Sequence, residues 1–189
     1  MAEDQFKVLK HISLALAATL EREVGAALGR RVPVLHRYQA EEVARGPCLT
    51  LLHVEAVSRG ENLDREYEST GQGEQFRAQP LPLRSRFLVS AWAPPPDDQE
   101  LLGAVLRTFH DHAQLEVEGQ AAEAAAYDAV PEVSLATLPF PELERLAQAF
   151  RMPLAPSASY WVSYQIRSAR VTPIKRVLER VTDYRQIKG

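Results

Sequence analysis

The chain has 189 residues, 46% of them hydrophobic and 25% charged, with a formal net charge of −3. A chain of this size can bury a substantial core, and we expect one domain spanning residues 1–189. The lone cysteine, Cys48, excludes an intramolecular disulfide, and no apolar run reaches the roughly 18 residues that a membrane span needs. Glu3 and Asp4 lie where a signal peptide would carry positive charge. We therefore expect cytoplasmic synthesis and no direct membrane insertion.

The first half of the chain predicts one long helix and two strands. Apolar residues recur every three or four positions from Phe6 to Leu28, and Gly29 follows where a helix would end. A short strand is predicted near 32–35 and a longer one over 49–57. Residues 58–79 are polar and show neither the helical nor the strand period. They predict a mobile loop or arm, either a tolerated surface insertion or a segment ordered on binding a neighbour.

The middle of the chain reads as a strand, a sharp turn and a helix. Residues 87–92 alternate as in a strand covered on both faces, and three prolines then end the strand. Asp97 is predicted to cap the following helix, with Glu100 completing a capping box. Apolar residues from Leu101 to Phe109 give that helix one stripe that packs on the sheet. Trp92 is interpreted, with Trp161 later in the chain, as a core residue rather than part of a docking surface.

Shorter elements follow. Residues 116–127 fit a marginal helix, 133–137 a strand, and 160–166 another strand. Pro141 at a first helical position opens a short helix that ends near Phe150. The final segment is ambiguous, because the apolar positions over 171–181 also fit a helix; we favour an extended arm over 171–189.

Charge is distributed unevenly along the sequence. From Arg167 onward there are seven basic and two acidic residues, a net of +5, so the rest of the chain carries −8. No aromatic residues of the base-stacking kind are interleaved with the basic ones, and an acidic body repels phosphate. These features argue against nucleic acid as a partner. They favour an acidic protein surface or the acidic body of a neighbouring copy.

The one local cluster of metal-ligand residue types is His110-Asp111-His112. Residues two apart on a helix do not face each other, so the tripeptide would supply two ligands only by leaving helical geometry. The histidines are better explained by their position near a helix C-terminus, where protonated imidazoles interact favourably with the dipole. The sequence has no Gly-rich phosphate loop and no nucleophile elbow. We therefore predict no enzyme activity, metal or cofactor, and a metal-dependent hydrolase using this cluster is a remote alternative.

Four segments together resemble a known family. They are LTLLHVEAVSRGENLDRE (49–66), PLPLRSRFLVSAWA (80–93), QELLGAVLRTF (99–109) and YWVSYQI (160–166). Their hydrophobic pattern, the Glu61-Asn62 pair and the Ala-Trp-Ala step resemble the cap, or tail-terminator, family of phage-tail-like contractile injection systems. Where the family shows an Arg-Asn pair soon after Glu-Asn, this chain has Arg65 and Glu66, and an additional C-terminal domain of some members has no counterpart.

The resemblance implies an α/β (α+β) fold, in which helices flank a mixed, largely antiparallel sheet. It also implies a structural cap: a ring, expected to be a hexamer, that binds the inner tube and sheath proteins at the end distal to the baseplate. Such a cap would end polymerisation and stabilise the extended sheath. The alternative is a tail-completion or adaptor protein at another junction of the same particle. The candidate partner-interface residues are Glu61, Asn62, Arg65, Arg170, Lys175, Arg176, Val177, Arg180 and Tyr184.

Overall fold

The computed structural model describes residues 7–60, 66–70, 73–115, 130–168 and 170–173. Its helices are α1 (Val8–Leu28), α2 (Ala40–Arg45), α3 (Asp97–Asp111) and α5 (Phe140–Ala149). Its strands are β1 (Val34–Leu35), β2 (Cys48–Ser58), β3 (Glu66–Thr70), β4 (Gly73–Arg77), β5 (Leu81–Trp92), β6 (Glu132–Ala136), β7 (Ser157–Ile166) and β8 (Val171–Pro173). None of the described helices is long and apolar enough to cross a membrane.

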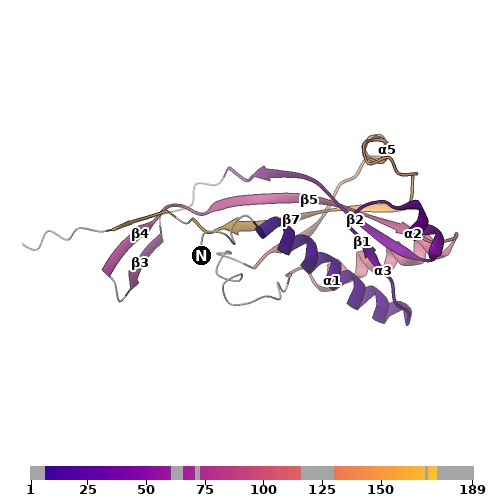
Figure 1. Ribbon diagram of the computed structural model, residues 1–189, viewed down its shortest axis with the longest axis horizontal. Helices are drawn as coiled ribbons and strands as arrows, with labels where there is room; N and C mark the ends of the chain where they lie inside the picture. The colour runs from indigo at the N-terminus through magenta and orange to yellow at the C-terminus, as the bar shows by residue number, and fades with distance from the viewer. Residues whose placement is uncertain (1–6, 61–65, 71–72, 116–129, 169, 174–189) are drawn as a thin grey trace, which may run out of the picture.

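The strands form a main sheet and a small one. The main sheet has the order β1-β2-β5-β7-β6, and the small sheet has the order β3-β4-β8. Of the described strand pairs, β1–β2 is parallel and the others are antiparallel. Figure 1 shows α1 and α3 on one side of the main sheet and α5 on the other, with β3 and β4 at the far end of the molecule from α2. The expected α+β fold with a mixed, mostly antiparallel sheet flanked by helices is confirmed.

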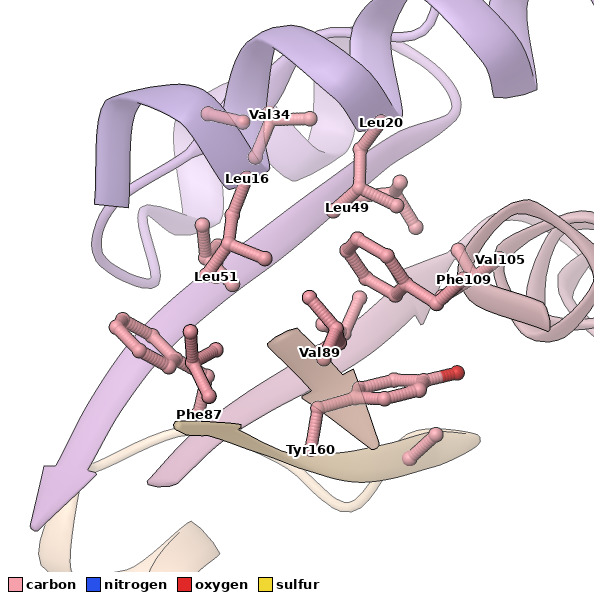
Figure 2. Close-up of a cluster of buried hydrophobic side chains, with 14 of the residues drawn as sticks. Leu16, Leu20, Val34, Leu49, Leu51, Phe87, Val89, Val105, Phe109 and Tyr160 are labelled. Atoms are coloured by element: carbon pink, nitrogen blue, oxygen red, sulfur yellow. The ribbon is translucent and has the colours of Figure 1, made fainter. Parts of the chain in front are cut away.

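The larger core lies between the sheet and the helices α1 and α3. Leu16 and Leu20 of α1 and Val105 and Phe109 of α3 point toward the sheet residues Leu49, Leu51, Phe87, Val89 and Tyr160 (Figure 2). The spacing of these helical residues produces the apolar stripes that the sequence predicts. Leu20, Leu49, Val89 and Val105 are completely buried. This core therefore joins α1 and α3 to the main sheet. We call the helices α1, α3 and α5, together with the part of the main sheet that they cover, the body.

A second, smaller core covers the opposite face of the sheet. Cys48, Leu52, Leu88 and Trp92 pack there with Ala147 of α5 and Met152. The Trp92 ring lies 4.9 Å from that of Tyr38, and its Nε1 donates to Thr50 Oγ1 at 3.2 Å. The core interpretation of Trp92 is confirmed, and Cys48 is buried in the same core. Burial raises the pKa of the Cys48 thiol, with Glu42 adding to the effect.

The sequence predicts the C-terminal end of α1 correctly but not the cap at the N-terminal end of α3. Gly29 adopts the left-handed conformation at the end of α1, with φ of 61°, as predicted. The capping box is wrong, because Asp97 is already the first residue of α3 and no side chain of the described residues caps the helix. The Pro96 carbonyl instead accepts from Gln99 N at 3.0 Å and Glu100 N at 3.4 Å. The acidic residues of the first turn therefore act through the helix dipole rather than as caps.

Strand β2 contains a bulge. His53 is paired with Phe87 and Glu55 with Arg86, so Val54 is an extra residue in β2. Residues up to Leu52 are buried, whereas Glu55, Ala56, Val57 and Ser58 are exposed. The bulge thus marks the place where β2 leaves the body.

Residues 58–79 contain more regular structure than their sequence suggests. Strands β3 and β4 form an antiparallel pair from Glu66↔Arg77 to Thr70↔Gly73, and β4 also pairs with β8. The described residues of the expected loop or arm therefore include two paired strands, although their sequence shows no strand period. The pairing with β8 also shows that Val171–Pro173 is extended, as favoured. Residues 116–127 and 174–189 fall outside the described ranges, and their predicted structures are untested.

Candidate partner interface

The main sheet continues as a ribbon of three strands from the edge of the larger core, where Tyr164 and Ser85 are still buried. This ribbon comprises residues 55–58 of β2, 81–86 of β5 and 163–166 of β7; with the β3-β4-β8 sheet we call it the arm. In Figure 1 the arm occupies the end of the molecule opposite α2. Hydrogen bonding in register holds the ribbon, from Ser58↔Leu83 on one side to Leu81↔Ile166 on the other.

The outer edges of the ribbon have no strand neighbour among the described residues. Strand β1 pairs with Leu49 and Thr50 of β2, so it ends before the ribbon, and β6 pairs with residues 159–163 of β7, so it reaches only the first β7 residue of the ribbon. Within the described part of the chain, the backbone donors and acceptors along the outer edges of 55–58 and 164–166 are therefore open to another strand. An edge of this kind can accept a strand from a partner chain through main-chain hydrogen bonds.

Apolar side chains are exposed on the arm. Val57, Phe76, Leu81 and Val171 are each 40–49% exposed. They come from four different strands, so they are distributed over the whole arm rather than gathered at one loop. Exposed apolar residues beside open strand edges are typical of a protein-binding surface.

Among the predicted interface residues, the described part of the chain places Arg170. It lines a polar hollow of about 350 Å³ with Phe76, Arg77, Ala78, Gln79 and Thr172. The Arg170 carbonyl accepts from Ala78 N at 2.8 Å, and Arg77 Nη1 donates to the Ser168 carbonyl at 2.7 Å. These bonds join the chain after β7 to the chain after β4. Two arginines in one polar hollow fit a carboxylate.

The other predicted interface residues lie outside the described residues. They are Glu61, Asn62, Arg65, Lys175, Arg176, Val177, Arg180 and Tyr184. Their role in an interface stays a prediction. Strands β4 and β8 bring residues 75–77 of the first predicted arm and 171–173 of the second into one sheet, through pairs such as Phe76↔Thr172.

A buried arginine joins the arm to the body. Arg86 is 7% exposed, and its guanidinium makes a forked pair with the Glu142 carboxylate of α5, at 2.5 Å and 3.1 Å. It also donates to Ser159 Oγ at 2.8 Å and the Thr137 carbonyl at 3.0 Å. The bond to Glu142 raises the pKa of Arg86, and the bond to Arg86 lowers the pKa of Glu142. Each nitrogen of this guanidinium therefore donates a hydrogen bond to a group of its own chain.

Arg84, two residues earlier on the same strand face, has a different environment. Its guanidinium carbon lies 4.6 Å from the centroid of the Trp161 ring, against 5.7 Å for Arg86. Arg84 Nε is buried and has no hydrogen-bond partner among the described residues. Trp161 is half-buried, so the core interpretation holds for it only in part. We call Arg84 and Trp161 the guanidinium platform.

Sequence reasoning missed both arginines. The signal was the Arg-Ser-Arg step at 84–86, since alternate residues of a strand share a face. The partners Glu142 and Trp161 come from distant parts of the chain, and nothing local indicates them.

The His110-Asp111-His112 residues do not converge. His112 Nε2 lies 3.5 Å from Glu23 Oε2 of α1, and Asp111 Oδ2 lies 3.4 Å from Arg107 Nε. His110 instead lines an apolar hollow between α3 and β6. The described residues contain no group of three His, Cys, Asp or Glu placed to hold a metal ion.

Comparison with known proteins connects this architecture to one family. The family model of the Pvc16 N-terminal domain matches residues 11–179. A search of curated proteins found no match. Among solved structures, the sheath/tube terminator of an extracellular contractile injection system, PVC, in the extended state is similar with a TM-score of 0.66 and 11% identity, over 94% of this chain and 64% of that chain.

The tube-terminating cap of the anti-feeding prophage is similar with a TM-score of 0.63 and 12% identity, over 92% of this chain and 60% of that one. This chain therefore spans less than two thirds of the length of either structure. The similarity of fold covers the body and the arm together, and the family match extends over most of the sequence. The chain belongs to the Pvc16 N-terminal domain family.

Proposed function

We propose that this protein is the cap of a contractile injection system. In this role it ends tube and sheath polymerisation at the end distal to the baseplate and stabilises the extended sheath. The observation that carries the proposal is the fold shared with a sheath/tube terminator and a tube-terminating cap over more than nine tenths of this chain. Family membership supports the same role.

A cap of this kind meets a physical need. A tube of stacked rings is built from head-to-tail contacts that do not close, so it has no intrinsic length limit. A terminator presents one face that matches the last ring and another that does not match a further one. Its proposed partners are copies of itself in a ring, expected to be a hexamer, the inner tube protein and the sheath protein.

The arm is the part of the molecule best suited to the sheath contact. Its open edges and exposed apolar side chains can add to, or receive, a strand of a neighbouring subunit. The predicted interface residues of 61–65 and 170–184 flank the same small sheet in the sequence. Synthesis in the cytoplasm before incorporation into the particle is part of the proposal.

Electron microscopy of tail-like particles from producing cells tests this function. Cells that lack the chain should yield tubes of uncontrolled length, or particles without stable extended sheaths. Re-expression of the chain should restore a uniform length. Particles of unchanged length and normal sheath in its absence would contradict the cap function and favour an adaptor at another junction.

A further inference from the structure

The guanidinium platform has a cation without an anionic partner among the described residues. Arg84 is paired across the sheet with Val57 on one side and Ser163 on the other, neither of which is charged. The nearest acid along β2 is Glu55, whose carboxylate lies 3.7 Å from Arg86 instead. Within the described part of the chain, Arg84 has no ion pair, and its Nε has no acceptor.

Arg86 provides the internal comparison. Both arginines lie against the same tryptophan, on the same face of the same strand. Arg86 has a carboxylate, a carbonyl and a hydroxyl as acceptors, all from its own chain. Stacking on an indole holds a guanidinium flat and leaves its edge free for a carboxylate. Arg84 is therefore a preorganised carboxylate receptor whose ligand the described part of its own chain does not provide.

A suitable set of carboxylates lies at the other end of the molecule. The first turn of α3 carries Asp97, Asp98 and Glu100, which we call the acidic turn. None of them has an ion pair among the described residues, and Asp98 Oδ1 is buried without a hydrogen-bond partner there. All three lie at the N-terminal end of α3, where the helix dipole is positive and attracts negative side chains.

The acidic turn cannot reach the platform of its own chain. Arg84 and Trp92 are eight positions apart along β5, and α3 begins beyond Trp92; at about 3.3 Å per residue the separation is roughly 26 Å. A contact between the two must therefore join different copies. Because the platform and the acidic turn are different surfaces toward opposite ends of β5, the contact is head-to-tail, which is the kind that generates rings.

We propose that the guanidinium platform of one copy binds a carboxylate of the acidic turn of the next copy. This inference rests on the proposed ring-forming cap function. It specifies the subunit contact: Arg84 stacked on Trp161 receives a carboxylate of the neighbour's acidic turn in a charge-assisted pair. Each copy uses its platform once and its acidic turn once.

A charge-swap mixing experiment tests the contact. One variant carries Arg84→Glu, and the other carries Asp97→Lys with Glu100→Lys. Each variant alone places like charges in the contact, and native mass spectrometry over a concentration series should show assembly at least ten-fold weaker than for the wild-type chain. An equimolar mixture pairs the introduced glutamate of one variant with the introduced lysines of the other, and should restore assembly.

Two controls keep the result interpretable. Arg107→Glu changes the charge of an 81%-exposed arginine on α3 and should leave assembly unchanged. Circular dichroism melting should show that each variant is folded. Assembly that is unaffected by Arg84→Glu, or variants that do not recover on mixing, would overturn the proposal.

Cross-linking gives a second measurement that does not require stable rings in solution. Val57→Cys places a thiol beside Arg84, Asp97→Cys places one in the acidic turn, and the native Cys48 is 1% exposed. With a short bismaleimide, the double variant should form a ladder of covalent oligomers, both in concentrated solution and in purified particles, whereas Val57→Cys alone should remain monomeric because the head-to-tail contact places no second thiol opposite it. A ladder in neither preparation would refute the contact. The measurement of particle length tests the cap function separately from this contact, because a cap can still end the tube if its subunits meet through another surface.

Discussion

The body and the ribbon of the arm share the strands β2, β5 and β7, but these strands have different surroundings in the two regions. In the body, β2, β5 and β7 are covered on both faces, and residues such as Leu49, Leu88 and Val162 are fully buried. In the arm the same strands have open edges within the described residues, and Val57 and Leu81 are 40% and 49% exposed. The body therefore determines the fold. The arm continues the same strand pairing but exposes side chains and strand edges that a partner can bind.

Truncation in the body should have the largest effect. Phe87 is 1% exposed and lies in the larger core beside His53, with ring centroids 5.3 Å apart. Phe87→Ala removes most of the side chain and leaves a cavity, and should lower the free energy of unfolding by about 3–5 kcal/mol. Urea denaturation followed by circular dichroism measures the change. A loss below about 1 kcal/mol would show that the two regions differ less than their burial indicates.

Loss of Arg86 should have the second largest effect. Arg86→Gln removes the forked pair with Glu142 at the junction of body and arm. Because the Glu142 side chain is 35% exposed and is partly rehydrated, we expect a loss of about 2 kcal/mol rather than the larger loss of a fully buried pair. The same urea titration measures it.

Arg84→Gln is the matched control for Arg86→Gln. It changes the same residue type on the same strand face, but Arg84 has no ion pair within the described residues. Its effect on unfolding should be about 1 kcal/mol, as for a partly buried cation–π contact without an ion pair. Equal losses for the two variants would contradict the division between a structural arginine and a binding arginine.

The pH dependence of stability should show a smaller effect. The pKa of Glu142 is lowered from 4.5, first by its hydrogen bond with Arg86. A depressed carboxyl pKa contributes stability that is fully present above the unfolded-state value and lost as the pH falls through the folded-state value. Melting temperatures measured from about pH 6 to about pH 3 should fall more steeply for the wild-type chain than for Glu142→Gln. Parallel curves would indicate that the pair contributes little.

Substitution of an exposed apolar residue of the arm should have the smallest effect on stability. Val57 is 40% exposed at the open edge of β2, so Val57→Ser should change the free energy of unfolding by no more than about 0.5 kcal/mol. The same variant should weaken assembly into particles, which co-purification with the sheath measures. A large loss of stability with normal assembly would assign Val57 to the fold rather than to an interface.

The elements predictable from sequence were those with a local signal. The apolar stripe and Gly29 of α1, and the alternation in β5 and β7, each lie within a short stretch of chain, so their type was recognisable without tertiary information. The resemblance of four segments to tail terminators depended on the apolar patterns of β2, β5, α3 and β7 and on short residue pairs such as Glu61-Asn62.

The features that sequence reasoning missed depend on distant partners. Strand β4 is polar, and its pairing with β8 joins Phe76 to Thr172, which lie far apart in the sequence. Arg86 is buried because Glu142 lies against it, 56 residues later. The Asp97 cap failed for a local reason of another kind, because the carbonyl of Pro96 had already satisfied the first amide groups of α3.

The bulge at Val54 has a consequence for how β2 can vary. Because the side-chain period of a strand is two, one inserted residue shifts the phase of everything after it. With the bulge, Glu55 is opposite Arg86; in a regular ladder it would be opposite Ser85 and point toward the larger core. The two halves of β2 are therefore out of phase with each other. The pattern of inward and outward side chains that packs in the body up to His53 therefore does not constrain the pattern from Glu55 onward, where the side chains can vary to fit a partner.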